Sequence, residues 1–278
     1  MSPAPWSMSW EPLFIVLGVL AAIAYVRAWR RSDPRPSRRR AWAFGVGIAL
    51  VVVSLNSPME TIAVEYLLIF HLLQNVIIAD WAPPLLIIGL APAMRAAIAS
   101  RLGRPFAIVT RPQIALPVWL VGWYVIHLGG VYDFALRNPV LLNLEHLFMI
   151  AIGLVFWWPI ISDAPAAAGT LVRIAYVFSG FVLSAFLGLA LTFAPSFYDY
   201  YATRPERLWS ISADADQNLG GILMTSEQAI VLFAAIVWLL MKLFREEDEA
   251  EARLRAEQRS LVTAVESGEP PAAEPDAR

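Results

Sequence analysis

The chain of 278 residues contains no cysteine and few charged residues, and both deficits exclude whole classes of protein. Without cysteine there is no disulfide, no thiolate metal ligand and no catalytic thiol, so a metal would need histidine, methionine, carboxylate or backbone ligands. Charged residues make up 16% of the chain and are concentrated in a few loops and at the carboxyl end. This pattern offers no basic face for nucleic acid.

Hydrophobic residues dominate instead, at 58% of the chain with 11 tryptophans, which is typical of an integral membrane protein. We expect an all-α, polytopic transmembrane bundle of about seven spans, each about 17–25 residues long. The apolar segments lie near 12–29, 41–56, 62–82 with an extension to 92, 113–130, 139–161, 171–194 and 217–243.

The distribution of arginine predicts the orientation. The first apolar run, Leu13 to Trp29, has no basic residue before it and is followed by Arg30 and Arg31, so we expect a retained span rather than a cleaved signal peptide. With the N-terminus outside, only Arg137, Arg204 and Arg207 fall in outer loops, in agreement with the positive-inside rule. The C-terminus is then cytoplasmic.

Two segments depart from a plain span. In the third span, Pro83 and Pro84 remove backbone donors, which predicts a break or kink and a half-helix or re-entrant continuation. Asp80 is expected to accept backbone donors freed there. At the carboxyl end we expect a transmembrane domain over residues 1–244 and a charged cytoplasmic tail over 245–278, helical to about Arg259 and disordered from Glu266.

All three histidines lie in apolar runs, and counting along the spans places them in the outer half of the membrane. His71 is expected about 14 Å below an outer edge near residue 62. Ionisable groups in hydrocarbon tend to face a bundle interior and mark a functional site. His71, His127 and His146, with Met224 at a comparable depth, form a candidate copper site, because imidazole and thioether both ligate copper. The alternative is a set of interhelical hydrogen bonds, which is the better interpretation for His127.

Several polar residues are expected to support such a site, namely Glu145, Asn75, Asp133, Asp216 and Asp80. Asn75 shares a helix face with His71, and Asp216 shares one with Met224. Glu145 can hold an imidazole tautomer from outside the ligand set. Because Glu145 and His146 are adjacent on a helix and diverge by about 100°, they are not expected to face one ligand together.

Taken together, these segments resemble the polytopic CtaG family of cytochrome c oxidase assembly factors, which is distinct from the single-span copper chaperone of the same name. The resemblance covers roughly residues 40–248 in matching order and spacing. Its motifs are His71-Leu72-Leu73-Gln74-Asn75, Ala82-Pro83-Pro84-Leu85-Leu86, Val131-Tyr132-Asp133, Leu144-Glu145-His146-Leu147, Phe156-Trp157-Trp158-Pro159 and Asp216-Gln217-Asn218-Leu219-Gly220-Gly221.

The resemblance implies a non-enzymatic protein of the bacterial inner membrane that helps assemble haem-copper oxidase, with oxidase subunits or other assembly factors as partners besides membrane lipid. It also implies copper handling on the outer side. Two positions depart from the pattern: Asn75 stands where the family usually has a second histidine, and Thr225 where it usually has tryptophan. An amide is a poor copper ligand.

Two other functions remain open from the residues. One is an electron-transfer protein with haem b held axially by His146 and either His71 or His127. The other is a small-solute or ion transporter, whose pathway would follow the proline-broken third span and Asp80.

Overall fold

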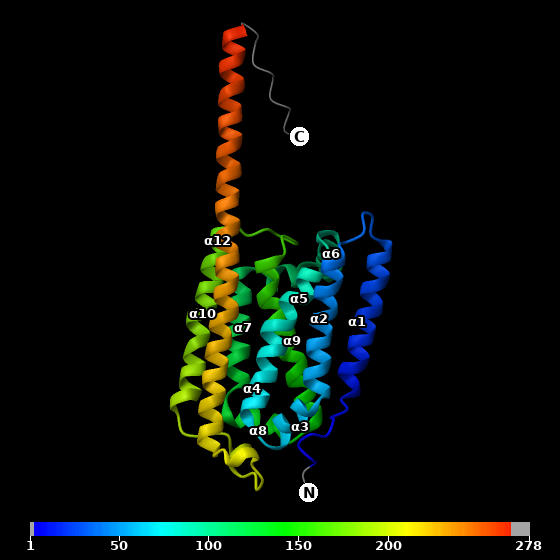
Figure 1. Ribbon diagram of the computed structural model, residues 1–278, viewed down its shortest axis with the longest axis vertical. Helices are drawn as coiled ribbons and strands as arrows, with labels where there is room; N and C mark the ends of the chain where they lie inside the picture. The colour runs from blue at the N-terminus through cyan, green and yellow to red at the C-terminus, as the bar shows by residue number, and fades with distance from the viewer. Residues whose placement is uncertain (1–2, 268–278) are drawn as a thin grey trace.

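The computed structural model describes residues 3–267, and every regular element in that range is helical (Figure 1). Six helices are long and apolar enough to cross a membrane, and the pair α7 and α8, bent by 70°, makes a seventh candidate. The predicted all-α bundle of about seven spans is therefore confirmed. The elements are α1 (Pro12–Arg31), α2 (Arg38–Asn56), α3 (Pro58–Glu65), α4 (Leu68–Val76), the π-helix η1 (Ile77–Trp81), α5 (Ala82–Gly89), α6 (Pro92–Val109), α7 (Pro112–Ile126), α8 (Gly129–Leu136), α9 (Pro139–Ile161), α10 (Thr170–Phe193), α11 (Asp199–Ala202), the 3₁₀ turn η2 (Leu208–Ser210) and α12 (Ala213–Ser267).

The bundle has two distinct ends. The tail end is the one from which the carboxyl half of α12 projects, and the opposite end is where α1 begins (Figure 1). The short helices α3 and α8 lie at this opposite end, whereas α6 and the α1–α2 loop lie at the tail end. In the predicted orientation, the tail end faces the cytoplasm.

Proline and side-chain caps determine where many helices begin. Proline occupies the first turn of α1, α3, α6, α7 and α9, where a missing N–H costs nothing. Ser57 accepts a hydrogen bond from the N–H of Met59 at the start of α3, and Asn138 accepts one from Val140 at the start of α9. These caps place the connections at the two ends of the bundle.

The proline pair of the third span produces a π-helical turn and not a break. Residues Leu68–Gly89 form one span of 22 residues in which η1 precedes Pro83 and Pro84. A wider turn relieves the crowding between each proline ring and the preceding carbonyl groups while the helix continues. The expected half-helix or re-entrant piece is therefore wrong.

The start of this span also differs from the prediction. Residues 58–65 form the separate helix α3, and Leu67 is extended before α4 begins at Leu68. His71 consequently lies in the first turn of α4 and not about 14 Å below a helix start. The reason is an acceptor from another helix: the Asp216 carboxylate on α12 accepts the N–H groups of Leu68 and Ile69. A distant residue that satisfies the first amides of a helix allows a new helix to start there.

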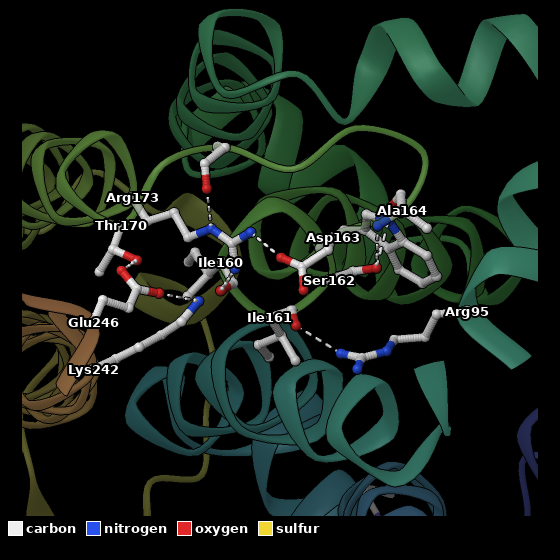
Figure 2. A network of polar contacts seen from close by, with 12 residues as sticks. Arg95, Ile160, Ile161, Ser162, Asp163, Ala164, Thr170, Arg173, Lys242 and Glu246 are labelled. Carbon is white, nitrogen blue, oxygen red and sulfur yellow. Dashed lines mark hydrogen bonds and ion pairs between the residues drawn. The ribbon is translucent and has the colours of Figure 1, made fainter. Parts of the chain in front are cut away.

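Arginine side chains hold the carboxyl ends of helices at the tail end. Arg173 donates to the carbonyl oxygen of Ile160 and pairs with Asp163, and Arg95 donates to Ile161 at 2.6 Å (Figure 2). Cations suit the last carbonyls of a helix. Partial burial raises the pKa of Asp163, but the hydrogen bond and charge of Arg173 outweigh it and hold that pKa below its ordinary 3.8.

The last helix crosses the predicted domain boundary. α12 is continuous from Ala213 to Ser267, and its described side chains beyond Phe244 are exposed. It is longer than the helix predicted to end near Arg259. The disorder predicted for the end of the chain falls largely on residues 268–278, which lie outside the described residues.

Candidate metal centre

Three of the predicted polar residues meet in the bundle interior. One ligand atom each from His71 on α4 and from Glu145 and His146 on α9 lie within 4.8 Å of one another. The side chains are almost fully buried, with exposed fractions of 0%, 4% and 1%. The His71 and His146 rings are 5.5 Å apart at their centroids. We call these three residues the triad.

Hydrogen bonds fix the tautomer of His71. The Tyr201 hydroxyl has one hydrogen, which it donates to the carbonyl oxygen of Ala63 at 2.5 Å. The contact between that hydroxyl and Nδ1 of His71, at 3.2 Å, must therefore be donated by the imidazole. The proton of neutral His71 lies on Nδ1, and the lone pair of Nε2 faces Glu145, whose Oε2 is 3.8 Å away.

The Glu145 carboxylate is held on one side only. Its Oε1 accepts a hydrogen bond from the Asn75 amide at 3.2 Å, which leaves Oε2 toward both imidazoles. Oε2 lies 3.5 Å from Nε2 of His146, so the expectation that these adjacent residues could not face one ligand is wrong. The 100° between neighbours applies to the Cβ directions. The longer side chain of glutamate turns back toward the axis of the bundle.

Four polar atoms of the triad have no hydrogen-bond partner among the described residues. They are Nε2 of His71, Oε2 of Glu145 and both ring nitrogens of His146. Buried polar atoms are paired in the great majority of cases, so a cluster of unpaired ones needs an explanation. Two imidazoles and one carboxylate fit a divalent transition metal ion such as Cu(II) or Zn(II). The residues present therefore fit a metal.

His127 lies outside the triad. Its Nδ1 donates to the Trp123 carbonyl oxygen at 2.7 Å, and its Nε2 has no hydrogen-bond partner among the described residues. The Tyr132 ring stacks on His127 with centroids 5.9 Å apart and contacts the His71 ring at 4.8 Å. Met224 is buried on α12, with 1% exposure.

The three aspartates named as support have other partners. Asp133 accepts the N–H groups of Asp199 and Tyr200 and so holds the start of α11. Asp216 holds the start of α4, as described above. Asp80 in η1 accepts a hydrogen bond from the Gln228 amide at 3.3 Å, and not from the backbone as expected.

Sequence reasoning missed two contributors to this region. Tyr201 orients His71, yet it lies in the polar connection between α10 and α12, and only the group of tyrosines at 198–201 hinted at a buried role. The other contributor is a buried hydrogen bond, which the Gln74 amide donates to the Glu60 carboxylate at 2.5 Å. Glu60 lies on α3 and Gln74 on α4, so their hydrogen bond depends on the break between these two helices. The hydropathy of the sequence does not indicate that break.

Comparison with known proteins gives the family. The family described as cytochrome c oxidase caa3 assembly factor matches residues 22–246. The chain belongs to this family. The resemblance drawn from the motifs is thereby confirmed. The matched residues include the helices that carry the triad.

An uncharacterized protein of Mycobacterium leprae is 25% identical over 260 residues. The match covers 86% of this chain but only 39% of that protein, so the chain spans about two fifths of the length of this curated relative. No solved structure matches the chain.

Proposed function

We propose that this assembly factor carries copper for haem-copper oxidase and holds the ion between His71, Glu145 and His146. The observation that carries the proposal is the group of four buried polar atoms without hydrogen-bond partners among the described residues, three of which could ligate one ion. Membership of the assembly-factor family supports copper as the cargo, because haem-copper oxidase needs copper.

The donor set refines the chemistry. The sequence favoured histidine with methionine, but the triad offers two nitrogen donors and one carboxylate oxygen. A carboxylate is a harder ligand than a thioether and favours Cu(II) over Cu(I). The proposal therefore retains His71 and His146, adds Glu145 and leaves His127 and Met224 out of the ligand set.

Surrounding hydrogen bonds prepare the triad for a cation. Tyr201 fixes the lone pair of His71 toward the centre, and Asn75 fixes one oxygen of Glu145. Partners that orient ligands in this way commonly change metal affinity by about 10–100-fold. Asn75, where the family pattern has histidine, thus acts on the carboxylate rather than on the metal.

The position of the triad supports a role in delivery. His71 lies in the first turn of α4 at the end of the bundle opposite the tail, which the arginine distribution predicts to be outside. Copper held there is close to the side from which oxidase receives it under this proposal. The partners would be oxidase subunits or other assembly factors in the bacterial inner membrane.

Metal analysis of purified protein tests the binding. The full chain is loaded with one equivalent of Cu(II), passed over a desalting column and analysed for copper beside His71→Ala, His146→Ala and Glu145→Gln. His127→Gln is the matched control, because His127 is equally buried but lies outside the triad. We expect wild type and control to retain copper and the triad variants to lose it. Equal copper in all five proteins contradicts the proposal.

Function in assembly needs a separate measurement. A host strain lacking the gene is complemented with the same variants and grown under copper limitation, and oxidase activity is assayed in membranes. We expect His127→Gln to restore activity and Glu145→Gln to restore it only when copper is added. Full activity in the strain without the gene would remove the assembly role.

A further inference from the structure

A large basic cavity lies at the tail end, away from the triad. It occupies about 1120 Å³ between α1, the α1–α2 loop, the start of α2 and α6. Five arginines line it, and Asp33 is the one acidic residue among the lining residues. The arginines are Arg27, Arg31, Arg35, Arg40 and Arg101.

The arginines are free to bind a ligand of opposite charge. Among the described residues, none of the five has a carboxylate within ion-pair distance. Arg27 and Arg31 are four residues apart on α1 and therefore share a face. Arg40 donates to the carbonyl oxygens of Ile88 and Leu90 at the end of α5, so its guanidinium is held at the cavity wall.

The walls of the cavity are well fixed. The Tyr25 ring stacks on Phe44 with centroids 4.1 Å apart, and its hydroxyl donates to the Gly89 carbonyl oxygen at 3.1 Å. Trp29 donates from its indole nitrogen to the carbonyl oxygen of Pro36, which ties the α1–α2 loop back onto α1. The arginines are consequently presented by a fixed α1–α2 hairpin.

An apolar groove continues from this cavity into the membrane region. The groove has a volume of about 390 Å³, and its lining, which includes Phe14, Leu17 and Trp158, is hydrophobic apart from the indole nitrogen of Trp158. Cavity and groove share four lining residues, which are Ala21, Phe44, Leu90 and Ile98. From Arg27 to Phe14 the two extend about 20 Å along α1.

We propose that the cavity and groove together bind one anionic phospholipid. Its phosphate would lie among Arg27, Arg31 and Arg101, and an acyl chain would follow the groove between α1 and α2. A basic pocket between transmembrane helices on the cytoplasmic side is the recognised form of an anionic headgroup site. A soluble phosphate would use the arginines but would leave the adjoining apolar groove without an occupant.

Native mass spectrometry of the detergent-purified full chain tests this site. The protein is titrated with phosphatidylglycerol and, separately, with phosphatidylcholine. The test variant combines Arg27→Gln, Arg31→Gln and Arg101→Gln. The matched control combines Arg30→Gln, Arg39→Gln and Arg104→Gln, which remove the same charge from the same end but do not line the cavity.

We expect one phosphatidylglycerol to bind wild type and control in preference to phosphatidylcholine. Each arginine near a membrane surface contributes roughly a fivefold factor, so the triple test variant should bind about 100-fold more weakly. Thermal unfolding of each variant without added lipid establishes that it is folded. Equal binding of phosphatidylglycerol by folded test and control variants would overturn the proposal, because it would indicate non-selective lipid around the bundle.

A second pair of variants separates lipid from free phosphate. Ala21→Trp fills the junction of cavity and groove, whereas Ala22→Trp adds the same bulk beside it on α1. We expect the first substitution alone to weaken phosphatidylglycerol binding, and millimolar inorganic phosphate not to displace the lipid. If phosphate competes fully and Ala21→Trp has no effect, the site takes a soluble anion and the phospholipid assignment is wrong.

Discussion

The start of α4 depends on one buried carboxylate, and Asp216→Ala should expose that dependence. Asp216 is fully buried on α12 and accepts hydrogen bonds from the N–H groups of Leu68 and Ile69 at 2.8 and 2.9 Å. It also accepts one from the Arg207 guanidinium at 2.8 Å. The substitution removes the carboxylate that accepts these three hydrogen bonds and leaves their donors where water barely reaches.

The magnitude follows from these contacts. Leaving a buried N–H unpaired costs about 1–3 kcal/mol, and two are affected. Arg207 retains its hydrogen bonds to the carbonyl oxygens of Tyr201 and Ile211, and its side chain is 16% exposed. Loss of its hydrogen bond to Asp216 therefore costs less, about 1 kcal/mol. We expect the free energy of unfolding to fall by about 3–7 kcal/mol in total, which corresponds to roughly 10 °C in Tm.

Thermal unfolding in detergent, followed by circular dichroism, is the assay. Asp214→Ala is the matched control, since Asp214 lies two residues earlier on α12 and accepts one exposed hydrogen bond, from Ser196. It should cost no more than about 1 kcal/mol. If the two variants unfold at the same temperature, Asp216 does not hold the start of α4. Copper retention should also fall in Asp216→Ala, because His71 lies in that first turn.

Three further predictions concern packing, pH and the triad. Gly153→Ala should prevent α9 from packing on η1, because a Cβ would come within 2.3 Å of the Ala79 carbonyl oxygen, and the variant should lose several degrees in Tm. Stabilisation by the Asp163–Arg173 pair should be complete above about pH 4 and lost as pH falls through the lowered pKa of Asp163, as measured by Tm against pH. Asn75→Ala should lower the affinity for Cu(II) by about 10-fold, measured by competition with a chelator, because Oε1 of Glu145 loses its hydrogen-bond donor.

Each of these has its own control. At Gly45 an added Cβ meets nothing within 4 Å, so Gly45→Ala should keep or slightly raise Tm; an equal loss at both glycines would refute the packing argument. Asp163→Asn should remove only the part of the acid dependence of Tm that this pair contributes, and the effect is modest since the Asp163 side chain is 69% exposed. Unchanged copper affinity in Asn75→Ala would show that this hydrogen bond does not prepare Glu145 for the ion.

Hydropathy and motif spacing predicted most of the architecture, for reasons that are local. A membrane span needs a continuous apolar run, so the long helices such as α9 and α10 were predicted within a few residues. Buried histidine and glutamate in such runs pointed to the interior, and the triad includes two of the three histidines.

What the sequence did not indicate depends on contacts between distant segments. The separation of α3 from α4 requires the Asp216 carboxylate, 147 residues after Ile69. The continuity of the third span through Pro83 depends on a π-turn, which Gly153 on α9 accommodates by lacking a Cβ beside Ala79. Neither partner can be identified from a hydropathy profile, because both act across helices.

Glu145 differs from the buried carboxylates of Asp216 and Asp133 in a way that supports the proposed cation at the triad. Both oxygens of Asp216 and both oxygens of Asp133 accept hydrogen bonds from backbone N–H groups. Glu145 has a partner for Oε1 alone, and its Oε2 is 3.5 Å from His146 and 3.8 Å from His71. These separations are too long for hydrogen bonds but leave space for an ion to bind between the groups.

A proton shared within the triad is the alternative to the proposed metal ion, and the separations between the groups favour the metal ion. A proton shared between Glu145 and His146 would draw the two atoms to about 2.7–2.9 Å, the range of charge-assisted hydrogen bonds. The lone pair of His71 would still face a carboxylate oxygen, with two acceptors opposed in a region of low dielectric. Under the proposed function, a divalent ion takes one electron pair from each of the three residues and leaves only one ring nitrogen of His146 without a partner among the described residues. The fixed tautomer of His71 and the one-sided hold on Glu145 support this proposal, because both direct an electron pair toward the same centre.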